Sequence, residues 1–173
     1  FYGEKWAHGA GDKLAGMLPW FFAHEAAHLF QRIGARANMP MEQSWVHEGG
    51  AEALAALAVD ELDAAAPGYV EKRIDEARED CAQGLRKLDG KPLNASAKAG
   101  AFGNYYACGL VMHIAIDREV RAASGGERSL YDVWALFLER VRDGANWDQE
   151  TFLAAARSLG AEHSTAFAQA IAA

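Results

Sequence analysis

Between residues 20 and 30 the chain reads Trp20-Phe-Phe-Ala-His24-Glu25-Ala-Ala-His28-Leu-Phe30, a His-Glu-x-x-His pattern inside an apolar run of helical length. Residues four apart on an α-helix project from one face, so His24 and His28 are placed to ligate a single ion. Two such imidazoles can fill two corners of a zinc tetrahedron. Glu25 then points beside the metal, where it can act as a general base toward a water molecule. The pattern is short enough to arise by chance, so its neighbourhood has to decide.

Composition restricts the classes of protein that need consideration. The chain has 173 residues, which fits one domain over 1–173, and 51% of them are hydrophobic, enough for a packed core. The net charge of −7 leaves no basic surface of the kind that binds polyanions, so we expect no nucleic-acid partner. No apolar run reaches the roughly 18–20 residues of a transmembrane helix. Because the chain opens at Phe1 without Met, we expect a processed or excised piece and assign no compartment.

The two cysteines, Cys81 and Cys108, lack the spacing of a metal site and do not make a disulfide framework. We expect each to be a buried thiol.

Hydrophobic periodicity predicts a mainly α fold of about six to seven helices with little or no sheet. Asp12 and Ser44 are expected N-caps, Pro19 should start or kink the first helix, and Ser129 should form a capping box with Asp132. The expected helices span about 12–33, 45–65, 69–88, 102–123, 130–142, 148–159 and 162–172. The first carries an apolar stripe that flanks the histidine face and comprises Leu18, Phe22, Ala26, Leu29, Phe30 and Ile33. Of these, Phe22 and Phe30 are expected in the core. Phe21 is also expected in the core, although it shares the metal face and is a candidate for the wall of a substrate pocket.

A catalytic zinc needs three protein ligands and one open position. The second helix offers two glutamates, within Trp45-Val-His-Glu48-Gly-Gly-Ala-Glu52. The segment between His28 and Glu48 is long enough for the first helix to end and the chain to return, so Glu48 is the expected third ligand. Glu52, one turn further on, is the alternative ligand or a carboxylate that orients a ligating histidine.

His-Glu-x-x-His followed by Trp-x-x-Glu-Gly resembles the gluzincin metallopeptidases, and most closely the aminopeptidase N and glycyl aminopeptidase families. The resemblance implies a helical zincin-like catalytic lobe, one Zn²⁺ ion and hydrolysis of peptide or protein substrates. It also implies that Glu48, before the glycine, is the third ligand. Tyr105-Tyr106-Ala-Cys108-Gly109 resembles the Tyr-x-x-Gly helix of these families, which makes Tyr106 the donor to the developing oxyanion. Cys108 stands where the families usually have Lys.

Aminopeptidases of this type also carry a Gly-rich segment, before the zinc helix, that binds the free amine of the substrate. Gly3-Glu4 and Gly9-Ala-Gly11 do not match that segment, so cleavage at the N-terminus rests on analogy alone. Two other functions remain open. One is a non-catalytic or degenerate zinc-binding module used for partner binding, and the other is a different zinc hydrolase.

Three further residues lie near the motifs. His113 follows Tyr106 by seven positions, so it is a candidate substrate contact on the same helix face, although packing is the commoner role of such a histidine. His47 points about 100° away from Glu48 and is expected to be exposed. Tyr105 is expected to pack.

Overall fold

The computed structural model describes residues 11–31 and 40–173, with side chains from residue 15 onward in the first range. Over these ranges the chain forms seven α-helices and no strand, which confirms the mainly α fold expected from the sequence. The α-helices are α2 (Gly11–Gln31), α3 (Ser44–Glu61), α4 (Tyr69–Lys87), α5 (Gly103–Ala123), α6 (Leu130–Arg142), α7 (Gln149–Ser158) and α8 (Glu162–Ala172). Two short 3-10 helices, η1 (Met41–Gln43) and η2 (Leu93–Ala95), precede α3 and α5.

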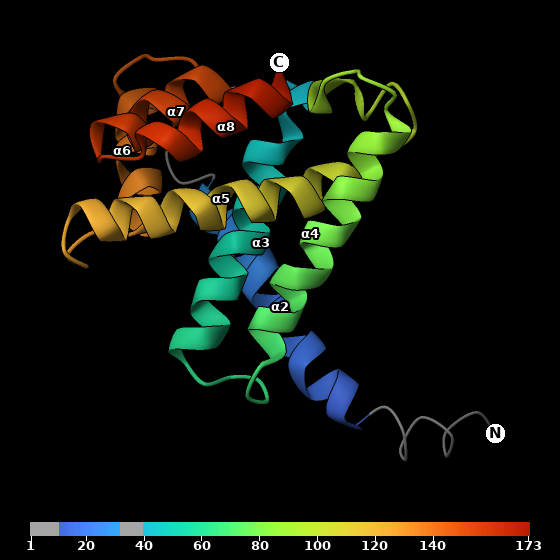
Figure 1. The fold of residues 1–173 in the computed structure, drawn as a ribbon. Coiled ribbons are helices and arrows are strands. Elements are labelled where there is room, and N and C mark those ends of the chain that lie inside the picture. Colours follow the sequence, from blue (N-terminus) through green and yellow to red (C-terminus); the bar gives the residue numbers. More distant parts are fainter. Residues whose placement is uncertain (1–10, 32–39) are drawn as a thin grey trace.

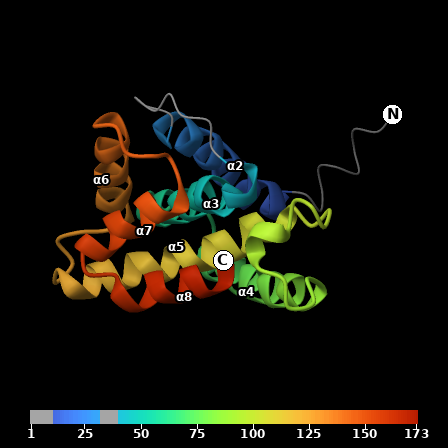
Figure 2. The ribbon, with the colours of Figure 1, turned by 90° about the horizontal axis from the view of Figure 1, so that it is seen from above.

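Helices α3 and α5 form the centre of the structure. Figure 2 shows α3 between α2 and α5, while α4 and α8 lie along the other side of α5. Helices α6, α7 and α8 gather at one end of α5 (Figure 1). None of the helices in the described ranges combines the length and the apolar character that crossing a bilayer requires.

The crossing of α3 and α5 brings two backbones into direct contact at a pair of glycines. A Cβ atom built on Gly49 would lie 2.2 Å from the Cα of Gly109, and a Cβ on Gly109 would lie 2.5 Å from the Cα of Gly49. Any side chain at either position would force the helices apart, because the obstructing atoms are main-chain atoms. The glycines therefore set the distance between the helices that carry Glu48 and Tyr106.

The helix ends agree with the expected caps in part. Ser129 and Asp132 form the expected capping box before α6, and Asp148 caps α7 by accepting a hydrogen bond from Thr151 N. Ser44 is not a cap, because it is already helical and its Oγ donates to Met41 O. Asp12 is likewise not the N-cap, since α2 begins at Gly11 and continues through Pro19. The predicted end of this helix, Ile33, lies outside the described residues.

The expected core positions of Phe21 and Phe22 on α2 are wrong, whereas Phe30 is half-buried and packs against the core. Phe22 is 65% exposed, Leu29 is 72% exposed and Phe21 is 53% exposed, whereas Trp20 and Ala27 are buried. The reason is that α2 turns its histidine-bearing face toward α3, which leaves the apolar residues on its other sides uncovered in the described part of the chain.

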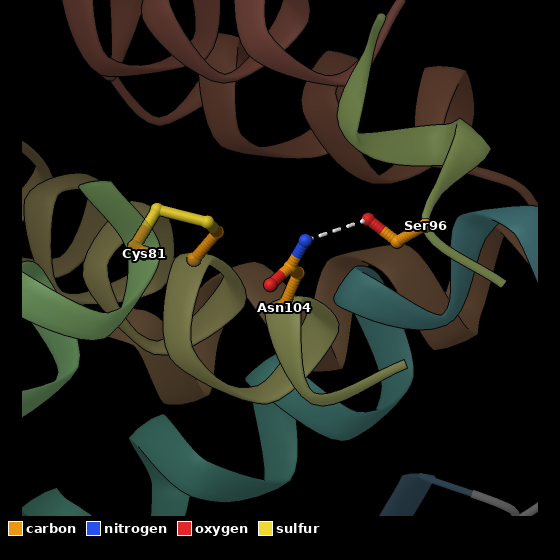
Figure 3. Close-up of a disulfide and its surroundings, with 4 residues drawn as sticks. Cys81, Ser96 and Asn104 are labelled. Carbon is orange, nitrogen blue, oxygen red and sulfur yellow. Dashed lines mark hydrogen bonds between the residues drawn. A yellow bond between two sulfur atoms is a disulfide. The ribbon is translucent and has the colours of Figure 1, made fainter. Parts of the chain in front are cut away.

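The sequence analysis expected two buried thiols, but the two cysteines form a disulfide. Cys81 on α4 is bonded to Cys108 on α5, with their Cα atoms 4.7 Å apart. Figure 3 shows the bond beside Asn104 of α5, whose amide donates a hydrogen bond to Ser96. The prediction failed because spacing along the chain does not report that two separate helices cross at these positions.

Removing the disulfide should destabilise the fold. Replacing Cys81 and Cys108 with Ala together should lower the free energy of unfolding by about 3 kcal/mol, because a 27-residue separation is then unconstrained in the unfolded chain. Urea titrations of both proteins, with and without a thiol reductant, measure the effect. The reductant should shift the wild-type midpoint and leave that of the double variant unchanged. An equal response of the two proteins would contradict the assignment.

Candidate metal centre

The two histidines of the His-Glu-x-x-His pattern meet Glu48 where α2 packs on α3. Glu48 Oε2 lies 3.5 Å from His24 Nε2 and 3.3 Å from His28 Nε2, and one ligand atom from each residue lies within 4.8 Å of the other two. Zinc at 2.0–2.1 Å from each ligand places tetrahedral ligands about 3.3 Å apart. The two carboxylate-to-imidazole distances are therefore close to the ligand spacing of a tetrahedral zinc site.

The electrostatics of the cluster favour a positive charge at its centre. Burial by itself would raise the pKa of Glu48, but contacts with His24, His28 and His47 hold it well below its ordinary value. Burial would lower the pKa of His24, yet Glu48 and Glu52 raise it to about 9. A divalent cation would provide the charge that these carboxylates now draw from the protonated imidazole of His24.

Glu52 lies on the other side of His24. Its Oε1 is 3.0 Å from His24 Nδ1, although off the direction required for a good hydrogen bond, and its Oε2 accepts from Trp20 Nε1 at 2.9 Å. Arg73 of α4 approaches the same carboxylate at 3.7 Å. Glu52 therefore occupies the place of a carboxylate that orients His24 while Glu48 faces the shared ligand position.

Gln31 is a residue of the centre that the sequence argument missed. Its Oε1 lies 3.0 Å from His28 Nδ1, and its Nε2 donates to His47 O at 2.9 Å. The buried amide therefore fixes the ring of His28 and links the end of α2 to α3. The spacing of three residues after His28, which shares a helix face, is the signal that could have identified it.

His47 is buried, so its expected exposure is wrong. Its ring stacks on that of His28 with centroids 4.2 Å apart, and its Nδ1 is 3.5 Å from Glu48 Oε1. Trp147 covers its other side at 6.3 Å. The expectation failed because neighbouring helices cover α3 on more than one face, so a residue that points away from Glu48 is buried as well.

Glu25 and Tyr106, the two residues expected to take part in catalysis, both lie beside His24. Glu25 is exposed and lines a cavity next to His24. The ring of Tyr106 stacks on the ring of His24 with centroids 6.0 Å apart. Burial and the negative charge of Glu48 raise the pKa of Tyr106 to about 12, so its hydroxyl stays protonated as a hydrogen-bond donor.

The cavity beside His24 and Glu25 has a volume of about 750 Å³. Phe21 lines it, in the position proposed for a pocket wall. Residues from four helices contribute to the cavity, and the set comprises Met17, Trp20, Phe21, His24, Glu25, Glu52, Tyr69, Lys72, Arg73, Glu76 and Tyr106.

His113 does not line this cavity, so the structure excludes the candidate role as a substrate contact and agrees with packing, the commoner role. The side chain is fully buried, its Nδ1 donates to Gly109 O at 2.8 Å, and its ring packs against Phe152 at 4.8 Å. Burial lowers the pKa of His113 to about 4. Tyr105 is also fully buried, as expected, and donates to Asn94 O.

Comparisons of the chain with protein-family models, with curated proteins and with solved structures found no match. The likeness to gluzincin metallopeptidases therefore rests on the sequence motifs alone.

We predict that the wild type binds one zinc ion and that Glu48→Ala abolishes this binding, because a third ligand is lost. Glu52→Ala and Gln31→Leu should retain zinc with an affinity about 10- to 100-fold lower, since each orients a ligating histidine. Mass spectrometry gives the metal content, and competition with a chelator gives the affinity. Gln169→Leu, an exposed change on α8, is the control. Tight binding by Glu48→Ala together with loss in Glu52→Ala would make Glu52 the ligand instead.

His113 should make stability depend on pH. Its folded pKa of about 4 lies below the ordinary histidine value of 6.5, so the unfolded chain takes up a proton first as the pH falls. Stability is then fully present above pH 6.5 and is lost toward pH 4. Between pH 7 and 4.5 the wild type should lose about 2–3 kcal/mol more than His113→Leu in urea titrations. Replacement of the exposed Gln169 by Leu should retain the wild-type dependence on pH. An equal loss of stability in wild type and His113→Leu between pH 7 and 4.5 would contradict the prediction.

Proposed function

We propose that the protein is a zinc-dependent metallopeptidase in which Glu25 is the general base. The observation that carries the proposal is the convergence of His24, His28 and Glu48, with both carboxylate-to-imidazole distances close to the ligand spacing of a zinc tetrahedron. A site that only stabilised the fold would need a fourth protein ligand. The described residues instead offer three ligands beside a cavity.

The ion held by these three side chains would supply a water of lowered pKa and a polarised carbonyl group. Glu25 follows His24 directly on α2, so its carboxylate projects toward the cavity beside the ligand position. From there it accepts the proton of the attacking water and passes it to the departing amine. Exposure of Glu25 to solvent allows it to exchange protons between cycles.

Tyr106 supports the same chemistry from α5. Its protonated hydroxyl donates a hydrogen bond to the carbonyl oxygen as negative charge develops there. The stacking of its ring on His24 holds it next to the metal centre. The raised pKa matters because a tyrosinate could not donate.

Glu25→Gln should lower kcat for a peptide library by about 10²–10⁴-fold with zinc content unchanged, because the amide cannot accept the proton. Tyr106→Phe should lower kcat by about 10²–10³-fold, since one oxyanion donor is lost. The readout is mass-spectrometric detection of cleaved peptides with zinc-loaded protein. Glu79→Gln, an exposed change on α4, is the matched control.

Equal rates for wild type and Glu25→Gln, with zinc bound in both, would overturn the proposal. That result would favour the alternative of a zinc-binding module that acts by partner binding.

A further inference from the structure

We propose, on the basis of the peptidase function above, that the cavity beside His24 binds a large aromatic or apolar side chain. This side chain would belong to a substrate residue that flanks the scissile bond. The inference names the class of substrate, which the metal centre alone does not restrict.

The cavity begins at the metal centre and follows one face of α2. Met17, Trp20 and Phe21 lie three to seven positions before His24, so the lined face extends about 10 Å from the ligand position. At about 750 Å³ the cavity is within the usual range for ligand pockets and admits a large side chain. A substrate bound at the metal would therefore present a neighbouring side chain to this space.

Four of the residues that line the cavity carry aromatic rings, namely Trp20, Phe21, Tyr69 and Tyr106. Trp20 and Tyr69 meet edge to face with ring centroids 6.1 Å apart. This contact depends on Gly16, because a Cβ atom there would lie 2.5 Å from the ring of Tyr69. Phe21 and Tyr106 contribute further rings from α2 and α5. Aromatic walls of this kind favour apolar and aromatic ligand groups, which pack edge to face or offset.

Apart from Glu25, the charged residues of the cavity are paired with one another. Arg73 lies 3.7 Å from Glu52 and 3.6 Å from Glu76, and its guanidinium stands 5.1 Å over the ring of Trp20. Lys72 approaches Glu76 at 3.8 Å. A charged substrate side chain would have to compete with these pairs, so the cavity favours a neutral one.

The cavity is coupled to the metal centre through Trp20. Its indole donates to Glu52, and Glu52 in turn contacts His24. A substrate side chain that contacts Trp20 would therefore touch the residue that hydrogen-bonds Glu52, the carboxylate that orients His24.

Two hydroxamates test the inference without requiring turnover. Zinc-loaded protein is titrated calorimetrically with 3-phenylpropanohydroxamic acid and with propanohydroxamic acid, which share the metal-binding group and differ in the phenyl ring. The phenyl compound should bind roughly 10- to 100-fold more tightly, as expected for burial of a phenyl group. Phe21→Ala should reduce this ratio by about 2- to 10-fold. Phe22→Ala should leave the affinity ratio unchanged, because Phe22 is also an exposed aromatic residue of α2 but does not line the cavity.

The outcomes separate the two proposals. Equal binding of the two hydroxamates by a protein with Glu25-dependent hydrolysis overturns the inference and leaves the peptidase proposal intact. A clear phenyl preference without Glu25-dependent hydrolysis supports the cavity and overturns the peptidase proposal. If Phe22→Ala lowers the affinity ratio and Phe21→Ala does not, the phenyl group binds to another surface and the inference is overturned. Failure of the zinc-loaded protein to bind either compound overturns it as well.

Discussion

The contact between Gly49 and Gly109 is the constraint on which the site depends. With no side chain on either residue, α3 and α5 touch at the level of their backbones. Glu48 directly precedes one of these glycines, and Tyr106 lies three residues before the other, on the turn that faces His24. A wider crossing would separate the third ligand of the candidate metal centre from the proposed oxyanion donor. The disulfide between Cys81 and Cys108 ties α4, which forms one wall of the cavity, to the same part of α5.

Burial of the ionisable groups explains why a positive charge would stabilise the centre. Glu48 is largely buried and faces three imidazoles, and Glu52 adds a second carboxylate beside His24. A buried carboxylate is costly unless a positive charge or hydrogen-bond donors compensate it. In the absence of metal, protonated histidine provides that charge, as the raised pKa of His24 indicates. Zinc binding and protonation thus compete for the same groups.

Much of the fold was predictable because helix periodicity and caps are local properties. The bounds of α6 and its capping box at Ser129 agree with prediction, and α4, α5, α7 and α8 agree within a residue or two. The errors concern the side of a helix that is covered. Phe22 was expected inside and is exposed, whereas His47 was expected outside and is buried. Amphipathic pattern is a poor guide on α2, because its polar histidine face is the one turned toward α3.

The sequence by itself determined the helical class and the candidate ligand types, since the placement of His24 and His28 on one face follows from helix geometry alone. Only the tertiary structure decided which glutamate meets both histidines and which orients one of them, because Glu48 and Glu52 share a helix face and differ in register against α2. It also decided the roles of Gln31 and His47, the disulfide, and the burial of His113 away from the cavity. These depend on how helices distant in sequence cross, which no local pattern encodes.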